Sequence, residues 1–419
     1  KEPRLIFPEK PTPVEKKQLS DMDNWMNNRV RAPIIFFYNA NPKMADIDPA
    51  EVVSNAIAKA LVYYYPLAGR LFCTERTAWA SKVGVDCAGS DSGGVVFVEA
   101  DADAEIRELG DDVFPHSPLV RELLYIEETM KENEFERIIV SGPILSFQVT
   151  RFKCGGFCLG LVYHHAVTDG YGVSLFMKAM SELIRGATIP STLPVWERHH
   201  HMCARSPPQV KNVEKFYHDP TVNPYASRKA FVTELNSTAP MTLFMKHQHL
   251  QALRDRHGLH SCTKYELLTA CLWKFRTMIS KPHPDETTRV TCLTSARFAL
   301  RHIPKGFYGN AVVNPSSMCS VKELLAKPME EVIELVKKTK SLGMKEEFVK
   351  STIDHIATKP STPVITLNTT TTDVSFAESN KDFGWGDPAI GSVGNIPLFT
   401  AYYNRSKTTS GEDGTIISL

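Results

Sequence analysis

The stretch from Leu159 to Gly172 reads LGLVYHHAVTDGYG, and it places two histidines and an aspartate between an apolar run and glycines. The apolar run that leads into it, from Gly156 to His164, is typical of a strand covered on both faces. The glycines that follow favour a turn. The next segment, VSLFMKAMSELIRG, has the spacing of an amphipathic helix that ends at Gly186. The sequence therefore predicts a strand, a polar turn and a helix in succession.

Within this turn, His165 and Asp169 are the candidate chemical groups. A histidine at the end of a strand can point into a cleft. Its imidazole titrates near neutral pH and is the usual general base for an alcohol or amine nucleophile. Asp169 is close enough in sequence to brace the turn. On this motif alone, a structural histidine paired with a local aspartate is the default interpretation.

The segments around this motif indicate two mixed α/β halves. A chain of 419 residues is too long for one hydrophobic core, so two domains of roughly 200 residues are expected. In the first half the pattern predicts a helix over Pro49 to Leu61 and strands over 95–100 and 144–152. The stretch from 189 to 208 is rich in Pro, His and Arg, which is typical of a linker.

The second half opens with the strand-like MTLFMKHQ at 241–248. A helix is predicted after Thr263, because Glu266 stands three residues beyond this potential cap. We then expect a strand over RVTCLTSARF at 289–298, one long polar helix from about Val321 to Met344, and a strand-rich close from 364 to 419. The fold class is therefore α/β, with two halves joined by a long crossover.

The nearly equal numbers of positive and negative residues argue against partners that bind through charge. Lys plus Arg is 48 against 47 Asp plus Glu, a formal net charge of +1, so neither nucleic acid nor an anionic membrane is an expected partner. No apolar run is long enough to span a bilayer, and no signal peptide is visible. The nine cysteines are odd in number and scattered, which is typical of reduced thiols in a cytoplasmic protein.

Two groups of residues could in principle bind a metal. Cys154 and Cys158 have a suitable spacing, but no second pair completes a site. The tract His199 to His201 with Cys203 lies in the expected linker, where a solvated loop is the favoured interpretation. The sequence therefore predicts no metal site.

A second motif, DFGWG at 382–386, joins the first. Together with HHAVTDG it resembles the plant BAHD acyltransferases, which transfer acyl groups from acyl-coenzyme A to alcohols or amines. Their two signatures are HxxxD, here His165 and Asp169, and DFGWG. The resemblance extends over nearly the whole chain and is strongest to the group of alcohol acyltransferases, benzyl alcohol benzoyltransferases and taxane acyltransferases. It includes the stretches YYYPLAGRL (63–71), VTRFKCGGF (149–157), LTACLWKFRT (268–277) and GFYGNAVV (306–313).

The resemblance implies two chloramphenicol-acetyltransferase-like domains, each a mixed sheet with helices, joined by a long crossover loop. The N-terminal domain, with HxxxD, is expected at 1–190 and the crossover linker at 191–213. The C-terminal domain, with DFGWG, is expected at 214–419, with part of 383–405 packing against the N-terminal domain.

The resemblance also implies a mechanism. His165 is expected midway along a channel between the domains, as general base for the acceptor hydroxyl. Acyl-CoA is then a co-substrate, the other partner is a small-molecule alcohol, and neither a covalent acyl-enzyme nor a permanently bound cofactor is needed. The family pattern implies structural roles for Asp169, which pairs with Arg297, and for Asp382 and Trp385. A monomer is expected.

Two further sets of contacts are predicted. Phosphates favour helix N-termini and cations, so Ser261, Thr263 and Lys264 are the candidate CoA-binding residues, with an ordinary solvated charge as the alternative for Lys264. Ala32, Ile34 and Phe36 alternate along the strand RAPIIFFYNA and share one face. They offer no hydroxyl, which indicates an apolar acceptor. The alternative is that this strand belongs to the core.

Two other functions stay open. HHAVTDG also fits the HHxxxDG signature of peptide-synthetase condensation domains, which form amides from carrier-bound substrates, although DFGWG favours the free-standing CoA enzyme. The other alternative is a non-catalytic descendant that acts as a binding protein.

Overall fold

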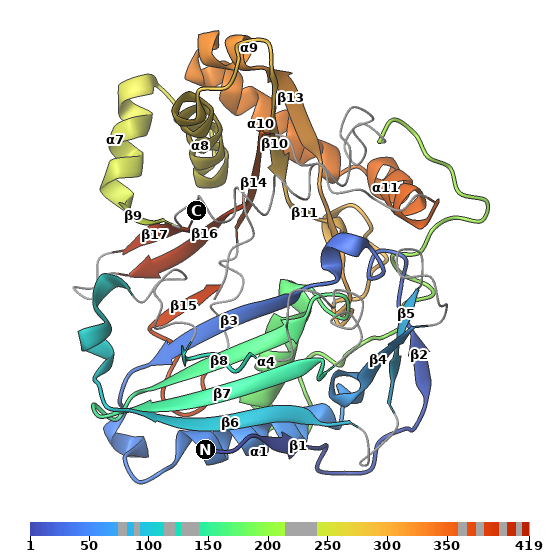
Figure 1. The fold of residues 1–419 in the computed structure, drawn as a ribbon, viewed down its shortest axis with the longest axis vertical. Helices are drawn as coiled ribbons and strands as arrows, with labels where there is room; N and C mark the ends of the chain where they lie inside the picture. The colour runs from blue at the N-terminus through green and yellow to red at the C-terminus, as the bar shows by residue number, and fades with distance from the viewer. Residues whose placement is uncertain are drawn as a thin grey trace. The chain divides into compact units, whose positions relative to one another are not determined.

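The computed structural model describes residues 1–73, 82–87, 93–112, 122–126, 142–213, 241–358, 367–373, 381–393, 400–407 and 413–418. The chain divides into two compact units. Unit 1 comprises Lys1–Cys203, Ile303–Asn310 and Phe376–Asn395, and unit 2 comprises Ala204–His302, Ala311–Ser375 and Ile396–Leu419. Both are mixed α/β units, as the sequence predicts (Figure 1).

Unit 1 is built on a six-stranded sheet with the order β1-β6-β7-β8-β3-β15. The β6–β7 pair is parallel, and the other neighbours are antiparallel. The strands are β1 (Arg4–Ile6), β3 (Arg31–Tyr38), β6 (Val95–Ala102), β7 (Leu145–Phe152), β8 (Phe157–His164) and β15 (Ile390–Val393). The edge strand β15 therefore comes from a part of the chain far beyond the rest of the sheet.

Two helices cover one face of this sheet, α1 (Pro49–Leu61) and α4 (Gly170–Ile184). Their apolar side chains join those of β3, β7 and β8 in one buried core. A smaller sheet has the order β2-β5-β4, with β2 (Lys16–Gln18), β4 (Arg70–Cys73) and β5 (Val83–Asp86). Among the residues described in unit 1, 3-10 helices are formed by η1 (Met26–Asn28), η2 (Pro42–Met44), η3 (Tyr65–Ala68) and η5 (Ile106–Asp112).

Unit 2 has its own six-stranded sheet, with the order β13-β10-β14-β16-β17-β9 (Figure 1). Its strands are β9 (Thr242–Lys246), β10 (Thr287–Cys292), β13 (Ser316–Ser320), β14 (Leu367–Asp373), β16 (Thr400–Lys407) and β17 (Asp413–Ser418). The two-stranded ribbon of β11 (Thr294–Ser295) and β12 (Val312–Val313) and the 3-10 helix η6 (Ala296–Phe298) complete the non-helical part.

In the described part of unit 2 the helices are α7 (His247–His257), α8 (Lys264–Ser280), α9 (Val321–Ala326), α10 (Met329–Gly343) and α11 (Glu346–Thr358). α8 and α10 pack their apolar residues against β10 and β16 in a second buried core. The capping box predicted at the start of α8 is confirmed, because Thr263 Oγ1 accepts from the Glu266 backbone while Glu266 reaches back to the Thr263 backbone.

Three expectations for unit 2 need correction. The single helix expected from Val321 to Met344 is wrong: it is two helices, because Pro328 cannot continue α9 and instead precedes the first turn of α10. The strand expected over 289–298 ends at Cys292, and a short ribbon and η6 follow it. α7 and α11 were not predicted, because their polar sequences carry little apolar periodicity or follow directly on another element.

Candidate active site

The strand, turn and helix predicted around HHAVTDG are present. Every residue of β8 is buried, as expected for a strand covered on both faces. The turn is held at its start by two backbone hydrogen bonds, from His165 N to Val30 O at 2.8 Å and from Val167 N to His164 O at 3.0 Å. α4 begins at Gly170, with Asp169 as its N-cap.

Asp169 closes the turn. Its side chain accepts a hydrogen bond from Gly172 N at 2.9 Å, which satisfies one of the free N–H groups of the first helical turn. The residue is 2% exposed. Gly172 has no room for a side chain, because a Cβ there would lie 2.3 Å from the backbone oxygen of Tyr308. The turn and the helix start are therefore tightly constrained.

The two adjacent histidines differ in environment. His164 is buried, and its Nδ1 accepts a hydrogen bond from Ala166 N at 3.2 Å. His165 is half-buried, with its ring 5.7 Å from that of Tyr163. Burial lowers the pKa of His165 below its ordinary value, although the negative charge of Asp169 opposes this shift. A lowered pKa keeps the imidazole neutral at neutral pH, in the form that accepts a proton.

Arg297, the expected partner of Asp169, lies in unit 2 on η6, where it is half-buried. Asp169 lies in unit 1. Their pairing stays a prediction.

DFGWG forms a turn built on its own aspartate. Asp382 Oδ1 accepts hydrogen bonds from Gly384 N at 2.7 Å and Gly386 N at 2.8 Å. Both glycines have positive φ, +111° and +88°, which is the region that favours glycine. The Asp382 backbone oxygen accepts from Ser181 Oγ of α4 at 2.8 Å, and Trp385 is 8% exposed in the core of unit 1. These are the contacts of a structural turn.

The candidate CoA residues lie at the start of α8 in unit 2. Thr263 is the N-cap, Ser261 precedes it, and both are exposed. Lys264 is the first helical residue and is half-buried. The geometry is that of an accessible helix N-terminus next to a cation.

The candidate acceptor residues lie on β3. Ile34 and Phe36 are 7% and 1% exposed and belong to the core of unit 1. Ala32 is half-buried and packs at the edge of this core, paired with Tyr163 on β8. The burial of Ile34 and Phe36 favours the alternative interpretation of this strand as core.

Comparisons with known proteins agree over the whole chain. The Transferase family, which is the family of BAHD acyltransferases, matches residues 1–410. The chain belongs to this family.

The curated relatives of this BAHD protein are acyltransferases. Benzyl alcohol O-benzoyltransferase of Petunia hybrida is 39% identical over 429 residues, which cover 100% of this chain and 89% of the relative. (Z)-3-hexen-1-ol acetyltransferase of Arabidopsis thaliana is 36% identical, with 99% and 89% covered. This BAHD protein is thus an acyl-CoA-dependent O-acyltransferase.

Solved structures confirm the two-domain, chloramphenicol-acetyltransferase-like fold. Vinorine synthase matches with a TM-score of 0.72 at 20% identity, over 100% of this chain and 93% of that structure. F. sporotrichioides TRI101 in complex with coenzyme A and T-2 matches with a TM-score of 0.76 at 12% identity, over 97% and 95%.

Among the described residues, the BAHD protein has no cluster of three or more His, Cys, Asp or Glu side chains arranged to hold a metal. The tract at 199–203 is not a uniformly solvated loop either. His199 and His200 are exposed, whereas Arg198 is 0% and His201 7% exposed. Within the same described part of the chain, no helix has the length and apolar character that a membrane crossing requires.

Three residues that hold the His165 turn were not predicted from the sequence. Arg198 and Asn310 donate to the turn, and Asp23 binds both of them. The three form one buried cluster in unit 1. Asn310 belongs to GFYGNAVV, one of the stretches that carry the resemblance, so the family pattern was the available signal. Arg198 lies within the expected linker, and Asp23 has no local pattern that indicates a role.

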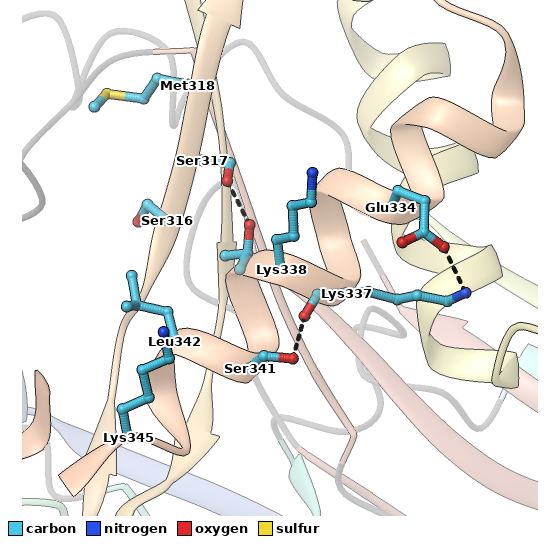
Figure 2. Close-up of a pocket in the computed structure, with 10 residues that line it drawn as sticks. Ser316, Ser317, Met318, Glu334, Lys337, Lys338, Ser341, Leu342 and Lys345 are labelled. Atoms are coloured by element: carbon cyan, nitrogen blue, oxygen red, sulfur yellow. Dashed lines mark hydrogen bonds and ion pairs between the residues drawn. The ribbon is translucent and has the colours of Figure 1, made fainter.

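A cavity of about 600 Å³ lies elsewhere, in unit 2 between β13 and α10. Figure 2 shows its lining, in which Ser316, Ser317 and Met318 come from β13 and Lys338 and Leu342 from α10, while Lys337 is paired with Glu334 at 2.7 Å. None of the predicted site residues lines it, so we do not include it in the candidate site.

Proposed function

We propose that this acyltransferase moves an acyl group from acyl-CoA to the hydroxyl of a largely apolar alcohol, with His165 as general base. One observation carries the assignment. His165 is the half-buried residue of a turn whose other members, from Ala166 to Asp169, are buried. A group at such a position can reach a substrate while its surroundings keep it neutral.

The proposed step is a direct transfer. Nε2 of His165 removes the proton of the acceptor hydroxyl as its oxygen attacks the thioester carbonyl, and a C–O bond forms. The tetrahedral oxyanion collapses, the C–S bond breaks, and the CoA thiolate leaves and can take the proton from the imidazolium. Because Nδ1 of His165 is buried, Nε2 is the nitrogen left to meet the acceptor. A thioester is already activated, so no covalent acyl-enzyme is required.

The family resemblance supports a channel between the two domains, which acyl-CoA and acceptor enter from opposite ends. Within this proposal, Ser261, Thr263 and Lys264 bind phosphate groups of CoA. An exposed helix N-terminus with a lysine at its first position suits this role, since the free N–H groups and the cation both favour an anion.

The names of the relatives support an apolar alcohol. One acts on benzyl alcohol with a benzoyl group, and another acetylates (Z)-3-hexen-1-ol. We propose an aromatic, short or branched acyl donor. On β3 we assign the acceptor contact to Ala32, at the rim of the core, whereas Ile34 and Phe36 act through packing.

We further propose that the protein acts as a monomer in the cytoplasm. All nine cysteines are free thiols, which suits a reducing compartment, and a net charge of +1 offers no strong field for a polyanionic partner. Size-exclusion chromatography with light scattering tests the oligomeric state.

The deciding experiment is a panel of benzoyl-, acetyl- and cinnamoyl-CoA with benzyl-type alcohols, an aliphatic alcohol, an amine and shikimate, read by mass spectrometry. We expect esters of the apolar alcohols. Amide products alone would favour the condensation-like alternative, and no CoA release with any pair would favour the non-catalytic one. A clear preference for shikimate would contradict the apolar acceptor.

Two variants locate the acceptor contact. Ala32→Ser adds a hydroxyl at the rim and should raise the relative rate with polyhydroxylated acceptors. Ile34→Ser is the control for a buried position on the same face, and it should lower the melting temperature without changing selectivity. A change of selectivity in Ile34→Ser and not in Ala32→Ser would move the contact to Ile34.

A further inference from the structure

An ion pair with no exposure to solvent lies directly beside the His165 turn. Arg198 Nη1 is 2.8 Å from Asp23 Oδ2 and 3.0 Å from Oδ1, and both side chains are 0% exposed. A buried charge is costly unless it is paired and fully hydrogen-bonded. Asp23 meets this condition. It also accepts hydrogen bonds from the backbone and hydroxyl of Ser20 and from the backbone and side chain of Asn310.

The guanidinium of Arg198 is enclosed by aromatic rings. Its carbon lies 4.4 Å from the ring centroid of Trp196, 5.2 Å from that of Phe307 and 5.0 Å from that of Tyr308. Gly309 completes the enclosure, since a Cβ there would be 1.8 Å from Nη1 of Arg198. These contacts hold the guanidinium in one place, with attraction between cation and rings added to the ion pair.

Two hydrogen bonds connect this cluster to the turn. Arg198 Nη2 donates to the backbone oxygen of Val167 at 2.8 Å, and Asn310 Nδ2 donates to the backbone oxygen of His165 at 2.7 Å. Both side chains are bonded to Asp23 as well, Arg198 through Nη1 and Asn310 through Nδ2. One carboxylate therefore orients two donors, and these fix two carbonyl groups of the turn, one of which belongs to His165 itself.

We propose that Asp23, Arg198 and Asn310 are positioning residues that set the orientation of the His165 imidazole for proton transfer. The inference rests on the proposed role of His165 as general base. The turn is irregular, so neither sheet nor helix hydrogen bonds fix its carbonyl groups. The cluster supplies the missing donors. If the turn moves, Nε2 loses its alignment with the acceptor hydroxyl, although substrate contacts made elsewhere persist.

The main test is Asn310→Ala, compared with Gln148→Ala as a matched control. Gln148 is also a buried amide of unit 1 that donates to a backbone carbonyl at 2.7 Å, but its acceptor is Glu122, outside the turn. The assay uses benzoyl-CoA with benzyl alcohol, or the most active pair of the panel. We expect Asn310→Ala to lower kcat by about 10- to 100-fold with KM unchanged for both substrates. Gln148→Ala should lower the melting temperature with little change in kcat.

A second pair of variants covers the case in which Asn310→Ala does not fold. Arg198→Lys keeps the positive charge beside Asp23, but a single ammonium cannot reproduce the fork that reaches Val167. Arg205→Lys is its control, because Arg205 pairs with the buried Asp354 at 2.7 Å in unit 2. We expect a fall in kcat of about 10- to 100-fold at constant KM for Arg198→Lys, and little change in kcat for Arg205→Lys.

His165→Ala, measured in parallel, distinguishes a failure of the positioning role from a failure of the general base. If His165→Ala is inactive while each test variant has the same kcat as its control, the positioning role is overturned and the general base stands. If His165→Ala retains more than about a tenth of the wild-type kcat, the assignment of the base itself fails, and the positioning role fails with it.

Discussion

Trp385 packs edge-on against Phe157, with ring centroids 5.1 Å apart and the ring planes at 76°. Phe157 is the first residue of β8, and His164 is its last. The DFGWG turn is therefore anchored at one end of the strand whose other end carries the histidine motif. At about 3.3 Å per residue, the seven steps between them place the two ends roughly 23 Å apart. Within unit 1, the second motif therefore packs at the end of β8 that lies away from the histidine motif.

We predict that Trp385→Ala acts on stability. Removing a buried aromatic side chain from a core typically costs about 3–5 kcal/mol. The melting temperature should fall strongly, while kcat per folded molecule stays near that of the wild type. Thermal denaturation followed by circular dichroism gives the melting temperature and the folded fraction, and kcat divided by that fraction checks the prediction. A large loss of kcat in fully folded enzyme would show that DFGWG takes part in the reaction.

The two adjacent histidines should respond differently to substitution. His165→Ala removes the proposed base, and loss of a general base lowers kcat by about 10²- to 10⁴-fold. His164→Ala should be milder, because this side chain is buried and bonded to the Ala166 backbone. Its effect is expected in the melting temperature. If His164→Ala is the inactive variant, His164 and not His165 takes the proton.

Asp169 and Arg297 are predicted to form an ion pair. Breaking one member of a buried pair typically costs about 3–5 kcal/mol, so Asp169→Ala and Arg297→Ala should each lower the free energy of unfolding. The double variant should lose less than the sum of the two, because the second substitution removes a charge that the first left unpaired. Chemical denaturation of all four proteins measures this coupling. Strictly additive losses would argue against direct contact.

Asp169→Asn separates the two roles of this residue. Asparagine caps a helix about as well as aspartate, so the bond to Gly172 N is kept and only the charge is lost. Asp169→Asn should therefore lower the free energy of unfolding by less than Asp169→Ala does. The expected difference is the contribution of the helix cap, about 0.5–2 kcal/mol.

The pH dependence of activity follows from the burial of His165. Burial lowers its pKa below the ordinary 6.5, so the imidazole stays neutral to lower pH than an exposed histidine does. The acid limb of kcat/KM should therefore have its midpoint below pH 6.5, with full activity near neutrality. A midpoint above pH 6.5 would mean that burial does not determine the pKa of the group that accepts the proton.

The lowered pKa of His165 also makes the stability of the folded protein depend on pH, so that stability falls at acidic pH. Unfolded chains take up a proton on His165 near pH 6.5, whereas the folded protein does so only at lower pH. The contribution to stability is complete above pH 6.5 and is lost as the pH falls below it. His165→Gln should show a smaller loss of unfolding free energy in this range, as measured by denaturant titration at several pH values.

The sequence predicted those helices and strands that neighbouring residues mark, through apolar spacing, turn residues or caps. The helix over Pro49–Leu61 and the buried strand before the histidine motif were found because apolar spacing and turn residues mark them directly. The start of α8 was found from Thr263 and Glu266, since a capping box acts within one turn. The break at Pro328 was missed because periodicity continues across it, although the proline itself was the available signal.

The cluster around the turn could not be predicted in this way. Asp23 and Arg198 are 175 positions apart, and Asp23 and Asn310 are 287 apart. No periodicity or cap connects residues at such distances. Their relation is set by the tertiary fold, in which a residue of an expected linker becomes fully buried. The acceptor residues illustrate the same limit, because alternation on β3 defines a face and does not say what covers it.

Unit 1 cannot finish folding early in synthesis, because some of its residues lie late in the chain. Residues 1–203 supply most of its sheet, but Asn310 and β15 are synthesised much later. Until then β3 is an open sheet edge, and Asp23 lacks two of its hydrogen-bond donors. Contacts of such long sequence separation form slowly. The histidine turn is therefore fully bonded only after Asn310 has been synthesised, and a nascent fragment that ends at residue 203 has Asp23 and Arg198 but lacks the hydrogen bond from Asn310 to the His165 carbonyl.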